Sequence, residues 1–129
     1  MSTHQLFFHL VWTTRDRLPM IDGPTARFLD EYFRKVAMQE RVEIVGLAIL
    51  RTHVHLVVRT RAWLDLPRLA QALKGGSNHQ VNRLPGNQLG LRWANEYSAT
   101  TVSPRMVPRV LRYLENQAQR HPDEALPAL

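Results

Sequence analysis

The chain has 129 residues, enough for one domain with its own core but not for two. It has no cysteine, which excludes disulfides and thiolate metal sites, and no apolar run approaches the roughly 20 residues that span a bilayer. The formal net charge is +6, supplied mainly by arginine, which favours a nucleic-acid partner, although many basic proteins bind none. The N-terminus lacks a secretory pattern, so we expect a cytoplasmic protein.

The first predicted element is a strand over residues 4–14, rich in aromatic and branched side chains. Asp22, followed by Gly-Pro, then provides an N-cap and a proline in the first turn of a helix. Residues 42–49 predict a second strand that is apolar on both faces. Gly46 indicates a bulge within it.

A third strand is predicted within the stretch from Ile49 to Arg59, after a short turn. Side chains alternate between the two faces of a strand, so His53 and His55 point the same way and could share one metal ion. The alternative is a half-exposed strand that happens to carry two histidines. In the expected sheet, His9 of the first strand lies on the same face as this pair.

A second helix starts at Asp65 and is expected to be interrupted at Lys74-Gly75-Gly76-Ser77-Asn78. A glycine pair exposes backbone N–H groups and permits close approach to a phosphate, which predicts a backbone contact with nucleic acid. The alternative interpretation is that the glycine pair only separates two helical pieces and contacts no nucleic acid.

Residues 96–102 predict a fourth strand, and Ser103-Pro104 begins a last helix that reaches His121, with Pro108 delaying or kinking its start. The order is therefore that of an α+β, ferredoxin-like βαββαβ domain with one additional C-terminal helix. We expect an antiparallel sheet with two helices on one face, the first strand beside the third, and the fourth strand at an edge.

The last helix carries Arg109, Tyr113 and Gln117 at spacings of four residues, beside an apolar stripe. A tyrosine on such a helix is often a packing residue at the edge of the core. As a nucleophile, Tyr113 has a rival in Tyr97, which lies on a predicted strand and lacks an amide partner at helical spacing.

Taken together, His53-Val54-His55 and Tyr113-Leu114-Glu115-Asn116-Gln117 give the chain a specific signature. With residues 8–14, 73–77 and 93–103, they make it resemble the single-tyrosine HUH transposases of bacterial insertion sequences and their repeat-associated relatives. The resemblance covers nearly the whole chain. One departure is Thr52, where members often place an acidic residue before the first histidine.

The resemblance implies a transposase that cuts and rejoins single-stranded DNA through a 5′-phosphotyrosine link. Tyr113 would be the nucleophile, and His53, His55 and Gln117 would bind a divalent metal ion, for which Mg²⁺ and Mn²⁺ both fit. His9 is interpreted as a support for the metal ligands or as a residue at the edge of the core.

The implied partners are single-stranded or hairpin DNA at the element ends and a second copy of the chain. In that homodimer, His53 and His55 of one chain would join Tyr113 of the other, since the apolar stripe of the last helix needs a surface and the free sheet face looks polar. The residues expected to contact DNA are Arg15, Arg17, Arg59, Arg61, Trp63, Lys74, Gly75, Gly76 and Arg109. The alternative function is a domesticated or non-catalytic protein that binds hairpin nucleic acid.

Overall fold

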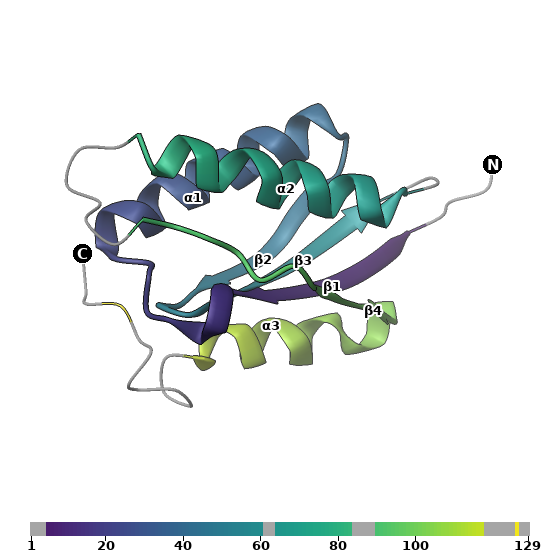
Figure 1. Cartoon of the computed structure of the whole chain (residues 1–129). Helices are drawn as coiled ribbons and strands as arrows, with labels where there is room; N and C mark the ends of the chain where they lie inside the picture. The colour runs from purple at the N-terminus through teal and green to yellow at the C-terminus, as the bar shows by residue number, and fades with distance from the viewer. Residues whose placement is uncertain (1–4, 61–63, 84–89, 118–125, 127–129) are drawn as a thin grey trace.

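A computed structural model of the chain describes residues 5–60, 64–83, 90–117 and 126 (Figure 1). The elements, in chain order, are β1 (Leu6–Thr13), η1 (Arg15–Arg17), α1 (Gly23–Gln39), β2 (Glu43–Ile49), β3 (His53–Thr60), α2 (Leu66–Val81), β4 (Ser98–Val102), η2 (Pro104–Met106) and α3 (Val107–Glu115). No helix in the described ranges is long and apolar enough to cross a membrane.

The four strands form one antiparallel sheet in the order β2-β3-β1-β4. The first strand therefore lies beside the third, and the fourth is an edge strand, as the ferredoxin-like prediction requires. This confirms the α+β fold class.

Two layers of helix cover the sheet on opposite faces: α1 and α2 lie on one, and α3 lies on the other (Figure 1). Asp22 and Asp65 cap α1 and α2 as predicted, each accepting a hydrogen bond from the backbone N–H three residues later. The core lies between the sheet and α1 and α2. It includes Leu10, Trp12, Leu29, Phe33, Val54, Leu56, Leu69 and Leu73.

Gly46 is a point of close contact between α3 and the sheet. The register between β2 and β3 shifts between Ile44 and Gly46, which confirms the predicted bulge. A Cβ at Gly46 would lie 2.5 Å from Leu111 Cδ2 and 3.2 Å from Leu114 Cδ2. The missing side chain thus makes room for two leucines of α3.

The predicted break at Lys74-Gly75-Gly76 is wrong, because α2 runs without interruption from Leu66 to Val81. A Cβ at Gly76 would overlap the hydroxyl of Tyr32, whose Cζ is 3.1 Å away, and this hydroxyl donates to Ala72 O at 3.4 Å. Glycine therefore permits close contact between α1 and α2, and its backbone N–H belongs to the helix rather than to a phosphate cradle.

Helix α3 ends at Glu115, with Asn116 as its C-cap, and Gln117 is again helical. The predicted continuation of the helix to His121 lies outside the described residues. Pro108 stands in the first turn of α3, and the delay that Pro108 predicted is seen as the separate 3-10 turn at Pro104–Met106.

We predict opposite effects of alanine at the two neighbouring glycines of α2. Gly76→Ala should lower the free energy of unfolding by about 1–3 kcal/mol, because the new methyl group overlaps Tyr32. Gly75→Ala meets only the flexible side chain of Gln71, so helix propensity should raise stability by up to about 1 kcal/mol. Urea denaturation measures both. Adding Tyr32→Phe should recover part of the Gly76→Ala loss, and equal effects at both glycines would contradict the packing explanation.

Candidate active site

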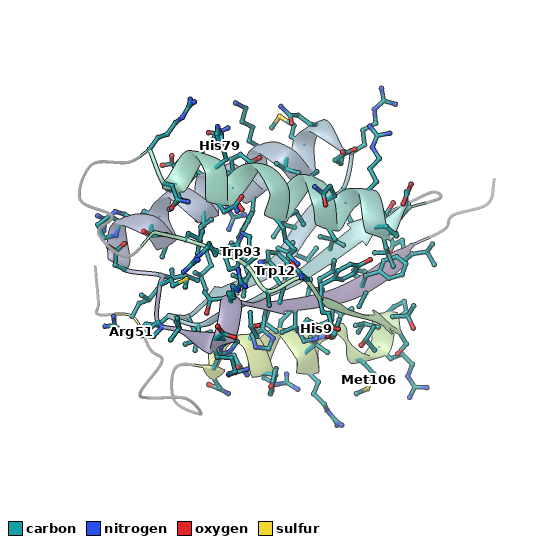
Figure 2. The ribbon with its side chains drawn as sticks, in the orientation of Figure 1. His9, Trp12, Arg51, His79, Trp93 and Met106 are labelled. Carbon is teal, nitrogen blue, oxygen red and sulfur yellow. The ribbon has the colours of Figure 1, made fainter. Side chains whose placement is uncertain are left out.

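Three histidines meet on the face of the sheet that α3 covers. His53 and His55 alternate along β3 and are 4% and 6% exposed, with ring centroids 5.0 Å apart. His9 comes from β1, and its ring centroid is 5.2 Å from that of His55. Figure 2 shows His9 on the α3 side of the sheet, and Trp12 on the side of α1 and α2. The half-exposed strand that was the alternative prediction is therefore wrong, because both imidazoles are buried.

Each histidine of the pair is held through its Nδ1 atom. Thr52 Oγ1 is 3.0 Å from His53 Nδ1, and His9 Nε2 is 3.0 Å from His55 Nδ1. Burial lowers the pKa of His9, so its ring is neutral at neutral pH and can accept a hydrogen bond. A metal ligand is commonly oriented by a hydrogen bond at its other ring nitrogen, and both histidines have that support here.

Tyr113 approaches the pair from α3. Its ring centroid is 5.7 Å from that of His55, with the ring planes at 81°. The contact is made within one chain, because Leu111 and Leu114 of the same helix pack against Gly46 and bring α3 onto its own sheet. The premise that α3 needs a partner subunit for a packing surface is therefore wrong.

Gln117 follows Tyr113 by one helical turn and is 1% exposed. Its Nε2 donates to Tyr113 O at 3.4 Å, whereas its Oε1 has no hydrogen-bond partner in the described part of the chain. A buried carbonyl oxygen without a partner costs free energy, so its retention suggests a ligand. An amide oxygen of this kind suits a divalent cation.

His53, His55 and Gln117 are the residues that could hold a metal ion. The described ranges contain no group of three or more His, Cys, Asp or Glu side chains able to do so. In the predicted ligand set the amide would be the third protein ligand, and two imidazoles plus one amide would leave positions for phosphate oxygens and water.

The arginines expected to contact DNA are spread over several surfaces. Arg15 and Arg17 are exposed in η1, where Asp16 and Arg17 have positive φ angles of 57° and 53°. Arg109 is exposed on α3, whereas Arg59 forms an ion pair with Glu43. Two further predicted contacts, Arg61 and Trp63, lie outside the described residues.

Lys74, Gly75 and Gly76 do not form the interrupted segment with exposed backbone N–H groups from which a phosphate contact was predicted. Lys74 Nζ donates to Ala94 O at 2.7 Å and to Glu96 O at 3.3 Å, and burial lowers the pKa of its ammonium group. The lysine thus fastens the segment before β4 to α2. The glycines lie within α2, on the sheet face that α1 and α2 cover, whereas the three histidines lie on the opposite face, under α3.

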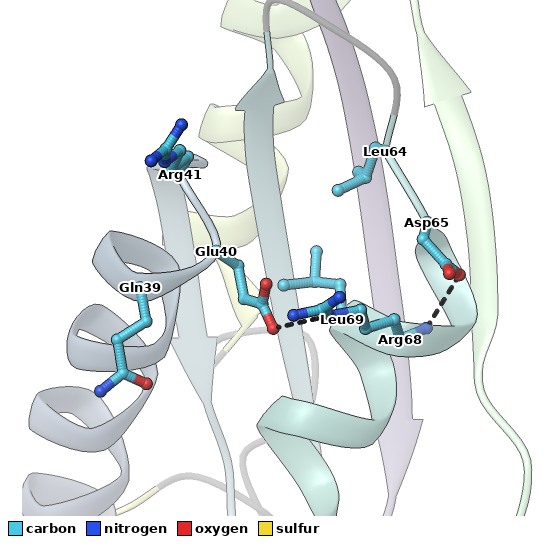
Figure 3. A pocket seen from close by; sticks show the side chains of 7 residues that line it. All are labelled: Gln39, Glu40, Arg41, Leu64, Asp65, Arg68 and Leu69. Carbon is cyan, nitrogen blue, oxygen red and sulfur yellow. Dashed lines mark hydrogen bonds and ion pairs between the residues drawn. The ribbon is translucent and has the colours of Figure 1, made fainter.

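A pocket of about 310 Å³ between the end of α1 and the start of α2 is far from this chemistry (Figure 3). Arg68 forms an ion pair with Glu40 at 3.5 Å there, and its backbone N–H donates to Asp65. The residues that line this pocket are partly polar, and they include no histidine or tyrosine.

Thr52 is the site residue whose role the sequence did not reveal. Its position directly before His53 was visible, but its hydroxyl could be assigned to His53 Nδ1 only once the turn geometry was known. Thr14 fixes that turn, because its backbone N–H donates to Thr52 O at 2.8 Å, while its hydroxyl donates to Leu18 O at 2.6 Å and lies 3.2 Å from Thr52 O. The rival nucleophile Tyr97 lies before β4, which starts at Ser98 and not at residue 96 as predicted.

Comparison with known proteins gives the family to which a chain with this fold and this α3 face belongs. The sequence model of the family described as "Transposase IS200 like" matches residues 2–117. The chain therefore belongs to the IS200-like transposase family.

Two known proteins illustrate the relationship. The ISDra2 transposase TnpA of Deinococcus radiodurans is 28% identical over 122 residues, which cover 88% of this chain and 85% of that protein. A crystal structure of a transposase from Deinococcus radiodurans R1 superimposes with a TM-score of 0.68 at 28% identity, covering 88% of this chain and 92% of the other.

A third protein supports the fold alone. The structure of a REP-associated tyrosine transposase bound to a REP hairpin has a TM-score of 0.73 at 14% identity. The match covers 90% of this chain and 68% of that chain.

We predict that Gln117→Met stabilises the protein in the absence of divalent metal. Methionine fills a similar volume without a buried carbonyl, so the free energy of unfolding should rise by about 1 kcal/mol. Chemical denaturation in EDTA measures the change. Gln117→Ala is the control and should destabilise, because it leaves a cavity. A destabilised Gln117→Met protein would show that the amide is satisfied.

Proposed function

We propose that the chain is a single-domain transposase that cuts and rejoins single-stranded DNA by metal-dependent transesterification, with Tyr113 as the nucleophile. The observation that carries the proposal is the meeting of Tyr113 with His55 on one face of the sheet, one turn before a buried amide oxygen without a partner. Packing alone requires neither the imidazole pair nor the amide.

The reaction exchanges one phosphate ester for another. The phenolic oxygen of Tyr113 loses its proton and forms a bond to the phosphorus, and the bond from phosphorus to the 3′ oxygen breaks. The leaving 3′ oxygen takes up a proton, and the 5′ phosphate stays linked to the tyrosine. Because the ester is conserved, a second 3′-OH can reverse the step and join a new strand without ATP.

His53, His55 and Gln117 would hold Mg²⁺ or Mn²⁺. When bound, the cation would withdraw charge from the scissile phosphate and stabilise the leaving 3′ oxygen. The chain's own part is positional: Thr52 and His9 orient the two imidazoles, α3 carries the phenol, and Gln117 follows directly after the C-cap of α3. The buried, unpartnered Oε1 of Gln117 fits this ligand set.

Single-stranded or hairpin DNA is the substrate that this architecture favours. The chain has a net charge of +6, with exposed arginines at Arg15, Arg17 and Arg109. The site is built on a sheet face, and the helix over that face carries the nucleophile instead of entering a major groove. A fold neighbour is described as bound to a REP hairpin, which is consistent with such a substrate.

The first test is for a covalent adduct at Tyr113. A single strand copied from the palindromic DNA that flanks the gene is labelled at its 3′ end, because a 5′-phosphotyrosine keeps the 3′ fragment. Wild-type protein should give a labelled adduct that survives denaturation, and Tyr113→Phe should abolish it while leaving DNA affinity nearly unchanged.

Tyr97→Phe is the matched control, and it should keep the adduct. An adduct that persists in Tyr113→Phe would place the nucleophile elsewhere. Hairpin binding without an adduct in the wild-type protein would favour the non-catalytic alternative, and equal reaction with a random duplex would refute the substrate class.

We predict that Mn²⁺ raises the melting temperature of the wild-type protein, because a ligand that binds only the folded state stabilises it. His53→Ala should abolish the shift. Thr52→Val, which removes the hydroxyl beside His53 Nδ1, should weaken Mn²⁺ binding by about 10–100-fold. Titration of the melting temperature measures both, and Thr60→Val, at the far end of β3, is the control. Full cleavage in excess EDTA would end the metal hypothesis.

We also propose a homodimer in which Tyr113 of one chain acts with His53 and His55 of the other during cleavage. The support is the incomplete burial of α3, since Val107 and Val110 are only half-buried. Leu6 and Met106 are exposed apolar side chains, at 46% and 41%. A second chain would cover such a surface.

Mixing His53→Ala protein with Tyr113→Phe protein tests the shared site. Under conditions that allow subunit exchange, a mixed dimer with shared sites has one site with both halves intact, so cleavage should return. Exchange is monitored with two differently labelled chains. The absence of recovery despite exchange would show that each chain cleaves with its own histidines and tyrosine, as their contact within one chain permits.

A further inference from the structure

A hollow at the edge of β1 lies beside the imidazole pair. Strand β4 pairs with β1 only as far as Val11, opposite Ser98, and the edge of β1 is next paired where Ala94 N donates to Thr13 O at 2.9 Å. Between these two points, the segment that connects Ala94 to Ser98 is not paired with β1. The resulting pocket has a volume of about 490 Å³, and its lining comprises Val11, Trp12, Thr13, Ala94, Asn95, Glu96, Tyr97 and Ser98.

The register of the sheet places this pocket one strand from the histidines. Val11 is paired with His55, and Thr13 is paired with His53. Paired residues on neighbouring strands point to the same face, and neighbouring strands are about 5 Å apart. A group in the pocket would therefore lie next to a phosphate bound at the imidazoles.

The wall of the pocket is fixed before any ligand arrives. Lys74 reaches from α2 to the carbonyl oxygens of Ala94 and Glu96, and Ala94 is also bonded to β1. Tyr97 is half-buried and packs against the core. A preformed pocket of a few hundred Å³ with apolar walls and a few polar groups is typical of a small-ligand site.

The side chains favour a nucleobase over a phosphate. Tyr97 offers an aromatic surface, Asn95 an amide that both donates and accepts, and Glu96 a carboxylate that accepts from an amino group. A carboxylate would repel a phosphate, whereas it can pair with the amino group of cytosine, adenine or guanine.

A second pocket, of about 410 Å³, adjoins the first and shares Ala94 and Asn95 with it. Its lining includes Arg15 and Arg92, together with Asp16 and Asn78. Two arginines beside a base pocket could bind the phosphate that follows the base along a strand.

We propose that the pocket of Asn95, Glu96 and Tyr97 binds one unpaired nucleobase next to the scissile phosphate, with the adjoining backbone running to Arg15 and Arg92. This inference rests on the proposed function. It makes the segment before β4 a determinant of where the strand is cut.

The test is a double-mutant cycle between protein and DNA. The 3′-labelled strand is prepared with a single abasic site at each of the three nucleotides on either side of the cut, and adduct formation is measured as kcat/KM. Asn95→Ala/Glu96→Ala should reduce kcat/KM at least about tenfold on the intact strand. On one abasic strand it should have almost no further effect, because the base that it contacted is missing.

Glu31→Ala/Gln39→Ala, on the exposed surface of α1, is the matched control and should leave every substrate unchanged. Arg92→Gln should reduce the slope of log affinity against log salt concentration by about 1, the change expected from losing one phosphate contact. The inference would be overturned if Asn95→Ala/Glu96→Ala left kcat/KM on the intact strand unchanged. It would also be overturned if the loss from this variant and the loss from the abasic site added at every position. Failure of the proposed function itself would be seen separately, as no adduct from the wild-type protein on any strand.

Discussion

The contact between α3 and the free face of the sheet is the interaction on which the candidate site depends. Gly46 lacks a side chain at the bulge of β2, so Leu111 and Leu114 can settle against the sheet. Tyr113 belongs to the same two turns of helix and is thereby brought to His55. The absence of a side chain at Gly46 thus lets the tyrosine of the last helix meet an imidazole of the neighbouring strand.

The two sheet faces have separate tasks. The face under α1 and α2 is apolar and closely packed, with Trp12 in edge contact with Phe33 and Trp93 at centroid distances of 5.5 and 5.9 Å. The face under α3 buries polar groups instead, which is unfavourable unless each has a partner. Thr52 and His9 supply two such partners. The apolar packing under α1 and α2 therefore offsets the free-energy cost of burying polar groups under α3.

Much of the fold could be predicted because local signals and tertiary structure agree. Alternation placed His53 and His55 on one face, the caps at Asp22 and Asp65 fixed two helix starts, and chain order predicted the strand order. The glycine pair of α2 was misread because a contact from another helix, that of Tyr32 with Gly76, overrides the local preference for a break. The position of α3 on its own sheet likewise depends on a contact between distant residues.

For the candidate site, the sequence indicates which residues to consider, but not the hydrogen bonds that hold them in position. The spacing of Tyr113 and Gln117 is local, whereas the pairing of Thr52 with His53 requires the turn that Thr14 fixes from another strand. Lys74 shows the same limit. It was predicted to contact DNA as part of the glycine segment, and the structure adds that its ammonium group donates to the carbonyl oxygens of Ala94 and Glu96, on the segment that forms the pocket beside the histidines. Lys74 therefore acts within the fold, because it holds the segment that forms one wall of this pocket.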